Sequence, residues 1–307
     1  MSTAALPPRT LTIGLLLAAA GSVAFSAKAI IVKLAYQYGV DAVTLIMYRM
    51  LFALPLFLGM VWWATYRSQP QGKPVEPLTR RDWLGLLGLG FSGYYLASYL
   101  DFLGLQYISA SLERLILYLN PTLVLLLGWV IYKRRITLRQ VSAMALSYAG
   151  VLIVFAQEVR FDGWTSVLGG LLVFGSALSY AVYLLYSGEM VKRLGSLRLV
   201  GWATTIACVL CIAQFLLLRP LSAAVVAPEV LWLSVLNAVL CTAAPVVMVM
   251  MAIERIGSGL ASQTGMIGPM STILLGVWIL GEPFNATVLA GTVLVLAGVL
   301  WVSRQRN

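Results

Sequence analysis

Six charged side chains lie inside apolar stretches of the chain, where an ionised group needs a partner. They are Lys28, Lys33, Arg49, Asp101, Glu113 and Arg114. A charge placed in hydrocarbon costs several kcal/mol, so we expect these residues to face the protein interior and to pair with one another. A buried cation can bind the carboxylate of a substrate, and a buried carboxylic acid can carry a proton.

Two roles for these charges fit the sequence. In the first, Lys28 and Arg49 bind or gate a substrate. Asp101 or Glu113 then carries a proton. In the second role the charges form a structural ion network, which is the favoured interpretation for the two acids, and Lys33 extends to the headgroups. The sequence leaves both roles open for the two cations.

Tyrosine and amide side chains at helical spacing predict the wall of a cavity. The candidates are Tyr95, Tyr99, Tyr118, Tyr183 and Gln263. Tyr95 and Tyr99 are four residues apart, so they share one face of a helix. Aromatic walls with a few hydrogen-bonding groups suit an amphipathic organic molecule better than a bare ion. The alternative places part of this set at the headgroup level, where tyrosine is common.

Three prolines fall inside apolar stretches and predict interruptions of the helices. They are Pro121, Pro245 and Pro269. A proline inside a helix removes one hydrogen bond and frees the carbonyl four residues earlier. Pro121 and Pro269 occupy matching positions of a repeat, so we expect a matched pair of interruptions around a central cavity. A packing kink without a ligand is the alternative for any single proline.

Composition identifies the elements that position these residues as membrane helices. The chain is 61% hydrophobic and only 10% charged, unlike an ordinary soluble domain. A helix needs about 20 apolar residues to cross a hydrocarbon core of roughly 30 Å. We predict an all-α polytopic membrane protein with ten transmembrane helices, at about 11–35, 42–65, 83–106, 109–132, 138–157, 164–187, 199–218, 229–252, 258–280 and 285–303.

The chain repeats itself with a shift of 148 residues. Ala149-Gly150-Val151-Leu152 recurs as Ala297-Gly298-Val299-Leu300. With five helices in each copy, the second copy enters the membrane upside down relative to the first. We therefore predict two inverted-topology repeats, residues 11–157 and 164–303, the usual architecture of alternating-access transporters. The interior charges are not repeated, since Glu113 corresponds to Ala261.

The distribution of lysine and arginine predicts the orientation. With the N-terminus in the cytoplasm, 15 of these 21 residues fall on the cytoplasmic side and two, Arg160 and Arg219, fall outside. The excess satisfies the positive-inside rule, so both termini are predicted to be cytoplasmic. The net charge of +10 then faces anionic lipid, and we expect the bilayer, not nucleic acid, as the macromolecular partner.

Several kinds of chemistry are not expected. The chain has no histidine, and Cys208, Cys211 and Cys241 lie in apolar stretches, where small packing residues are expected. Because no catalytic motif or metal-ligand spacing is visible, we predict no enzyme activity, no cofactor and no metal. A cleaved signal peptide is disfavoured because the first apolar run continues through Ile30 and Ile31.

Short stretches in a fixed order resemble the EamA family of the drug/metabolite transporter superfamily. They are Lys28, Arg49-Met50-Leu51-Phe52-Ala53, Gly104-Leu105-Gln106-Tyr107-Ile108-Ser109-Ala110, Pro121, Pro269, Leu280-Gly281-Glu282 and the two Ala-Gly-Val-Leu tetrapeptides. One departure is that Lys133-Arg134 stands where many members carry a Gly-Glu pair like Gly281-Glu282.

The resemblance implies a bacterial inner-membrane exporter of small metabolites, often amino acids. In such proteins helices 1–4 and 6–9 rock around a central cavity, while helices 5 and 10 brace the outside. The aromatic interior is similar to that of exporters of aromatic and other apolar amino acids, so we expect that substrate class. A drug or nucleotide-sugar transporter of the same fold, or a passive channel, is the alternative, and the oligomeric state is not predicted.

Overall fold

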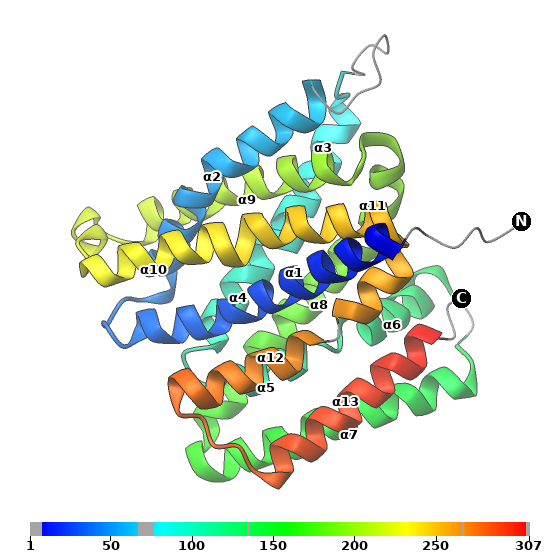
Figure 1. The fold of residues 1–307 in the computed structure, drawn as a ribbon. Helices are drawn as coiled ribbons and strands as arrows, with labels where there is room; N and C mark the ends of the chain where they lie inside the picture. The colour runs from blue at the N-terminus through cyan, green and yellow to red at the C-terminus, as the bar shows by residue number, and fades with distance from the viewer. Residues whose placement is uncertain (1–7, 67–76, 134–135, 266, 305–307) are drawn as a thin grey trace, which may run out of the picture.

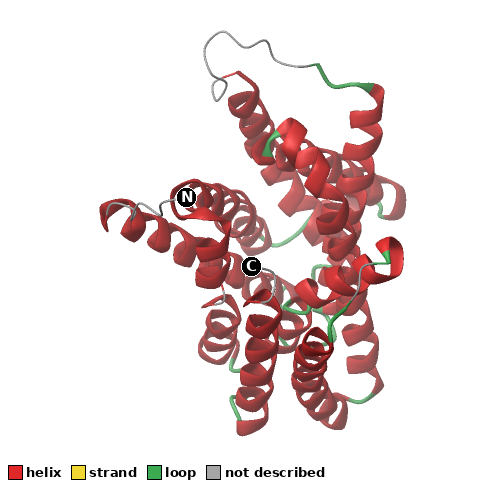
Figure 2. Cartoon of the chain, turned by 90° about the vertical axis from the view of Figure 1, so that its right-hand side faces the viewer, coloured by secondary structure: helices red, strands yellow, loops and turns green. Residues whose placement is uncertain are grey.

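The structure is a computed structural model that describes residues 8–66, 77–133, 136–265 and 267–304. Every regular element in these ranges is helical, as Figures 1 and 2 show. In chain order the elements are α1 (Pro8–Tyr36), α2 (Ala42–Tyr66), α3 (Arg80–Gly90), η1 (Phe91–Leu96), α4 (Ala97–Gly104), α5 (Ala110–Leu117), α6 (Asn120–Tyr132), α7 (Leu138–Asp162), α8 (Trp164–Leu194), α9 (Ser196–Leu218), η2 (Leu221–Ala224), α10 (Pro228–Ala238), η3 (Val239–Ala243), α11 (Ala244–Gly265), α12 (Ile267–Leu275), η4 (Gly276–Leu280) and α13 (Ala286–Arg304).

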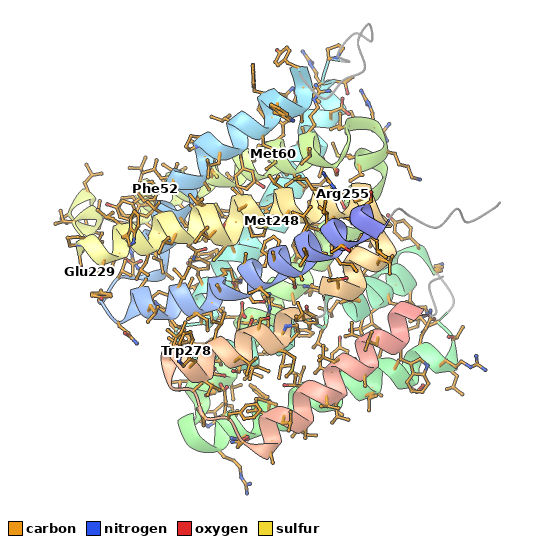
Figure 3. All side chains as sticks on the ribbon, in the orientation of Figure 1. Phe52, Met60, Glu229, Met248, Arg255 and Trp278 are labelled. Carbon is orange, nitrogen blue, oxygen red and sulfur yellow. The ribbon has the colours of Figure 1, made fainter. Side chains whose placement is uncertain are left out.

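Seven helices of the described residues are long and apolar enough to cross a membrane. They are 10–36, 42–66, 110–132, 138–160, 164–188, 196–218 and 228–253, and the ranges 267–280 and 286–301 form shorter apolar helices. Large apolar side chains such as Trp278, which is 83% exposed, project from the bundle where lipid is expected (Figure 3). The protein is therefore a helical, multi-pass membrane protein, as its composition predicts.

Helix ends follow local sequence signals. Thr79 and Asp82 form a capping box at the start of α3, and Thr137 and Gln140 form one at the start of α7. In such a box each side chain binds a free backbone N–H of the other residue. Gly163, with φ +71°, joins α7 to α8 by a single residue. These short connections keep consecutive helices antiparallel and adjacent.

Interruptions of the helices recur at the predicted shift of 148 residues. The π-helical segments η1 and η3 begin at Phe91 and Val239. The helix of the fourth predicted span breaks between α5 and α6, and Pro121 lies in the first turn of α6. Pro269 is the third residue of α12, and Pro245 is the second residue of α11, the helix that follows η3. All three prolines thus lie at helix interruptions, as the sequence predicts.

One predicted connection is absent from the described residues. The sequence predicts a break between residues 252 and 258, but α11 continues as helix through Gly265. Between Pro245 and Pro269 every residue keeps its backbone N–H, so hydrogen bonding can continue until proline frees a carbonyl. Helix α12 begins at Ile267, and residue 266 lies outside the described ranges.

Helix packing follows the repeat: a contact between two helices recurs between the helices at the corresponding positions of the other half. Helix α1 packs on α11 and α12, while α8 packs on α4 and α6. Helix α2 packs on α9, and α7 packs on α13, as Figure 1 shows. Gly150 and Gly298 of the repeated tetrapeptides both lie in the α7–α13 contact. A Cβ at Gly150 would lie 2.6 Å from the carbonyl oxygen of Gly291, so the small residue permits the close approach.

The start of α1 and the end of α13 lie at the same end of the bundle (Figure 1). We call this the near end, and we call the opposite end, with the connections 37–41, 105–109, 219–227 and 281–285, the far end. Glu229 lies at the start of the α10–α11 rod, and Arg255 lies toward its other end (Figure 3). The buried cysteines contribute to packing inside the bundle, since Cys208 contacts the sulfur of Met50 at 3.7 Å.

Candidate functional site

Three of the predicted interior charges meet in one cluster. Nζ of Lys28 lies 2.5 Å from Oδ2 of Asp101 and 3.0 Å from Oε1 of Glu113. The three side chains come from α1, α4 and α5, and they are 14%, 4% and 0% exposed. We call these residues the ion cluster. The prediction that the interior charges pair with one another is confirmed for this trio.

Local chain geometry brings the two acids together. Asp101 lies in the last turn of α4, and Glu113 lies in the first turn of α5. The intervening chain turns within five residues, where Leu105 donates its N–H to the carbonyl of Asp101 and Ser109 caps α5. Both carboxylates therefore face the same side of α1.

The ion cluster is unbalanced in hydrogen bonding. Within the described residues, Oε2 of Glu113 and Oδ1 of Asp101 have no hydrogen-bond partner, and Oε1 of Glu113 has only the ion-pair contact with Nζ of Lys28. Two acids thus share a single ammonium group. A buried polar group without a partner carries a desolvation cost of about 1–3 kcal/mol, and more when it is charged.

Two arginines flank the ion cluster. Nε of Arg49 donates to Oγ1 of Thr242 at 3.1 Å, and its guanidinium lies 5.2 Å from the ring centre of Phe102. A guanidinium nitrogen of Arg114 donates to Oγ of Ser26 at 2.8 Å. Among the described residues neither arginine forms an ion pair. Both cations are held by neutral groups.

The backbone freed by Pro269 is bound by side chains from other helices. The carbonyl four residues earlier belongs to Gly265, and it accepts the hydroxyls of Tyr118 at 2.7 Å and of Ser22 at 2.6 Å. Ser26 donates to the carbonyl of Gly268 at 2.8 Å. We call these five residues, with Arg114 bound to Ser26, the hydroxyl cluster. In this conformation protein side chains, not a ligand, satisfy the predicted polar backbone.

The glycine at position 268 makes room for that cluster. A Cβ there would lie 2.8 Å from the hydroxyl of Tyr118 and 2.9 Å from that of Ser22. Both distances are below ordinary contact, so any side chain would push the hydroxyl groups away. The interruption between α11 and α12 thus packs directly on α1 and α5.

The predicted aromatic residues divide into two groups away from the ion cluster. Tyr95 and Tyr99 stack with ring centres 6.4 Å apart, and Tyr99 packs with apolar residues of α2 and α9. The hydroxyl of Tyr183 lies 3.3 Å from that of Tyr94. Tyr94 is not among the predicted residues, because no other tyrosine lies three or four positions away from it. The side chain of Gln263 lies outside the described part of the structure.

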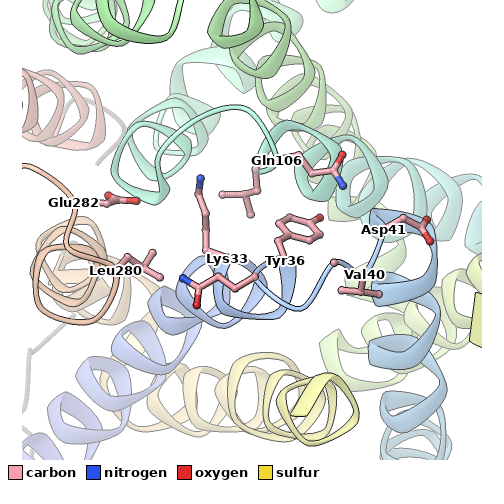
Figure 4. Close-up of a pocket in the computed structure, with 10 residues that line it drawn as sticks. Lys33, Tyr36, Val40, Asp41, Gln106, Leu280 and Glu282 are labelled. Carbon is pink, nitrogen blue, oxygen red and sulfur yellow. The ribbon is translucent and has the colours of Figure 1, made fainter. Parts of the chain in front are cut away.

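A pocket of about 670 Å³ opens at the far end of the bundle (Figure 4). Its polar lining residues include Lys33, Tyr36, Gln37, Asp41, Gln106 and Glu282. Lys33 follows Lys28 by five residues, so the pocket lies roughly 8 Å along α1 from the ion cluster. Tyr36, which lines the pocket, donates its hydroxyl to the carbonyl of Phe102 at 2.7 Å.

An exposed ion pair links connections at the far end. Nε of Arg219 lies 3.1 Å from Oδ1 of Asp41, and Thr44 donates its hydroxyl to Oδ2 at 2.6 Å. Partial burial raises the pKa of the Asp41 carboxyl, but hydrogen bonds from Thr44 and Arg219 outweigh it and hold the pKa below its ordinary value. The pair fastens the connection before α2 to the end of α9.

Two carboxylates that the sequence analysis did not include among the site residues bind the start of α5. Glu158 comes from α7 and Glu282 from the connection after η4, and both accept hydrogen bonds from residues 109–111. The Gly281-Glu282 dipeptide was visible in the sequence as part of a family pattern. Nothing in the sequence places Glu158 beside it, because that contact depends on how α7 packs.

Fold and site together define a class of protein. A multi-pass helical bundle with paired charges in its interior, and with interrupted helices beside them, is the construction of proteins that move polar solutes across membranes. The model of the EamA-like transporter family matches residues 12–156 and 167–304. The chain belongs to this family.

Curated relatives are similar over most of their length. The uncharacterized transporter YcbK of Bacillus subtilis is 30% identical over 277 residues, which cover 85% of this chain and 83% of YcbK. An uncharacterized transporter of Archaeoglobus fulgidus is 23% identical over 268 residues, 87% of this chain and 89% of the relative. A crystal structure with 18% identity matches 96% of this chain and 98% of its own with a TM-score of 0.61, which shows a shared fold.

Proposed function

We propose that this transporter exports amino acids with aromatic or apolar side chains by alternating access. It has ten spans in two inverted repeats, lies in the bacterial inner membrane and has both termini in the cytoplasm. The near end of the bundle then faces the cytoplasm and the far end faces outward. The excess of lysine and arginine in the predicted cytoplasmic connections supports this orientation.

Backbone features at a constant shift support the inverted repeat. The π-helical segments recur at Phe91 and Val239, and the packing glycines recur at 150 and 298. Left-handed residues end α6 and η4 at Lys133 and Gly281, again 148 residues apart. Helix α2 also corresponds to α9, and α7 corresponds to α13. Each of these helices packs on its own counterpart. Rocking of one half against the other around a central site needs this kind of symmetry.

The single observation that carries the substrate class is the ion cluster between two unpaired arginines. An amino acid brings one carboxylate and one ammonium group, and it therefore needs both kinds of partner. Lys28, Arg49 or Arg114 can donate hydrogen bonds to the carboxylate. The unsatisfied oxygens of Asp101 and Glu113 can accept hydrogen bonds from the ammonium group. The apolar residues that pack about α1 and α4, Phe102 among them, suit an apolar side chain.

Transport by the purified protein in proteoliposomes tests the proposal. A panel of labelled amino acids is offered with and without a pH gradient, and we expect aromatic and branched-chain members to exchange across the membrane. Lys28→Ala should abolish this exchange, and Lys192→Ala, which removes an exposed lysine at the end of α8, should not. If no amino acid moves and none competes with another, the proposed substrate class is wrong.

A transporter of another substrate class, such as drugs or nucleotide sugars, and a passive facilitator remain the alternatives. Counterflow distinguishes a passive facilitator from a carrier, because internal unlabelled substrate accelerates uptake only when one site alternates between the two sides. A facilitator would show uptake that is independent of internal substrate. Within the panel, competition by a drug or a nucleotide sugar and not by amino acids would favour the first.

A further inference from the structure

The N-terminus of α5 is bound by two carboxylates from other parts of the chain. Glu282 accepts the backbone N–H of Ala110 at 2.7 Å, that of Ser111 at 3.2 Å and the hydroxyl of Ser111 at 2.6 Å. Glu158 accepts the backbone N–H of Ser109 at 3.1 Å and also its hydroxyl. Free N–H groups and the helix dipole make this end of a helix a favourable place for an anion.

The backbone after η4 is shaped to deliver Glu282. Gly281 has a φ of +69°, a left-handed conformation that side chains rarely adopt. The turn returns the N–H of Glu282 to the carbonyl of Gly276 at 3.1 Å. A Cβ at Gly276 would lie 2.8 Å from Oε2 of Glu282, so the missing side chain leaves the path to α5 open. Two glycines therefore serve one carboxylate.

The carboxylates join parts of the molecule that must separate for the far end to open. Helix α5 belongs to the first repeat, Glu282 to the second, and Glu158 lies near the end of α7, which packs on α13. Hydrogen bonds to an ionised acceptor are about twice as strong as neutral ones. Movement of the start of α5 away from the 281–285 connection breaks all the bonds to Glu282 at once.

We propose that Glu158 and Glu282 form a latch that holds the outer side of the transporter closed. This inference rests on the proposed orientation and on alternating access. Opening toward the outside requires that the start of α5 leave both carboxylates, so the latch biases the resting protein toward the state that is open to the cytoplasm. Substrate bound near the ion cluster, one turn further along α5 at Glu113, opposes that bias by displacing α5.

The repeat supplies one carboxylate of the latch in its second copy only. Lys133 occupies the position of Gly281, has a φ of +51° and returns its N–H to the carbonyl of Gly128, as Gly281 does to Gly276. The same turn is thus built at the near end. The next residue in the sequence is Arg134 instead of glutamate, and it lies outside the described residues. The sequence supplies a carboxylate after this turn in the second repeat and not in the first.

Distance measurements between spin labels test the latch without any substrate. Nitroxides are placed by Tyr107→Cys and Phe284→Cys, two residues from Ser109 and from Glu282, at side chains that are 37% and 50% exposed. The background is the full chain in lipid nanodiscs with the three buried cysteines replaced by alanine. We expect Glu158→Gln with Glu282→Gln to increase the population of long distances about tenfold or more.

A matched control removes a carboxylate from the same end of the bundle. Glu229 is exposed and lies in the first turn of α10, so Glu229→Gln removes the same charge from another helix N-terminus. This variant should leave the distances unchanged. Ser111→Ala, which keeps both carboxylates and removes one donor, should shift the distances in the same direction by a smaller amount.

The outcomes separate the latch from the proposed function. Unchanged distances in the folded double variant and in Ser111→Ala, or an equal shift in Glu229→Gln, would overturn the latch. Longer distances in the double variant, together with a panel in which no amino acid moves, would keep the latch and reject the substrate class. Longer distances at the far end with transported amino acids support both.

Discussion

The charges of the ion cluster, two carboxylates and one ammonium group, affect the stability of the fold and, in the proposed function, also transport. Glu113 is fully buried and Asp101 nearly so, and Lys28 is the one cation in contact with both. Removing one partner of a buried ion pair leaves an uncompensated charge, whereas replacing the whole set can be neutral. Substitutions in pairs can therefore separate a structural role of Lys28 from a role in transport.

Lys28→Ala should lower the stability of the folded protein by about 3 kcal/mol, because the two acids lose their counter-charge. Adding Glu113→Gln should recover most of that loss, since fewer carboxylates then repel one another. Exchange of amino acids should be absent in both variants. Thermal unfolding in detergent and counterflow in proteoliposomes measure the two effects. Transport that recovers together with stability would assign Lys28 a purely structural role.

The far-end pair of Asp41 and Arg219 predicts a response to acid. Because hydrogen bonds hold the folded-state pKa of Asp41 below its ordinary value of about 4, folding favours the ionised form. This contribution is complete above the pKa of the unfolded chain and is lost as the pH falls through the lower folded value. Asp41→Asn should therefore make stability less dependent on pH between about 5 and 3. An unchanged acid dependence in the variant would contradict the role of this pair.

At the scale of elements, sequence and structure agree at the prolines and glycines of the repeat. Pro121 and Pro269 predict the interruptions next to α6 and in front of α12, and the repeat register places the packing glycines 150 and 298. The π-helical form of η3 was not predicted, because Pro245 beside it signals an interruption but not its geometry. Contacts such as Glu158 with Ser109 depend on tertiary packing that local patterns do not encode.

Gly268→Ala should disturb the junction of the interrupted helices. Its Cβ would meet the hydroxyls of Tyr118 and Ser22, so the bonds to the carbonyl of Gly265 would be strained or lost. We expect a loss of about 1–3 kcal/mol in stability and weaker transport. Gly188→Ala is the matched control, since nothing lies within 4 Å of its Cβ position in α8, and it should stabilise by up to about 1 kcal/mol. Equal effects of the two substitutions would rule out the packing argument.

Lys133→Gly should stabilise the protein. Lys133 is the one non-glycine residue with positive φ in the described ranges, at +51°, and a side chain in this region costs roughly 1 kcal/mol. Glycine removes most of that cost, and its entropy in the unfolded state reduces the net gain to a few tenths of a kcal/mol or slightly more. Lys192→Gly, inside the last turn of α8, should instead destabilise by up to about 1 kcal/mol. Thermal unfolding of both variants measures the difference, and a destabilised Lys133→Gly would contradict the strain.

At the scale of the whole molecule, symmetry in the backbone coexists with asymmetry in the charges. The two halves share interruptions, turns and packing glycines, whereas the ion cluster belongs to the first half alone: Asp101 and Glu113 correspond to Val249 and Ala261. Rocking needs two similar halves, but binding of a substrate with a defined head group does not. The carboxylates at the start of α5 are likewise one-sided, since Glu282 corresponds to Arg134 in the sequence of the first half.

The inverted repeat makes a topological prediction that follows from the odd number of spans in each half. Position 71, in the connection between α2 and α3, must face the cytoplasm, and Val225, which is 86% exposed before α10, must face outward. Single cysteines at these positions, with the native cysteines replaced, should react with a membrane-impermeant maleimide from opposite sides of sealed vesicles. Val225→Cys should be labelled in intact cells, and Gln71→Cys only after the membrane is opened.

Leu221 and Arg139 provide the controls for this labelling. Leu221→Cys, 72% exposed in η2, should behave as Val225→Cys does, and Arg139→Cys, exposed in the first turn of α7, should behave as Gln71→Cys does. The positions come from different repeats, so agreement fixes the relative orientation of the two halves as well as that of the whole chain. Labelling of Gln71→Cys and Val225→Cys from the same side would exclude an inverted pair of five-helix repeats, and with it rocking about a shared central site.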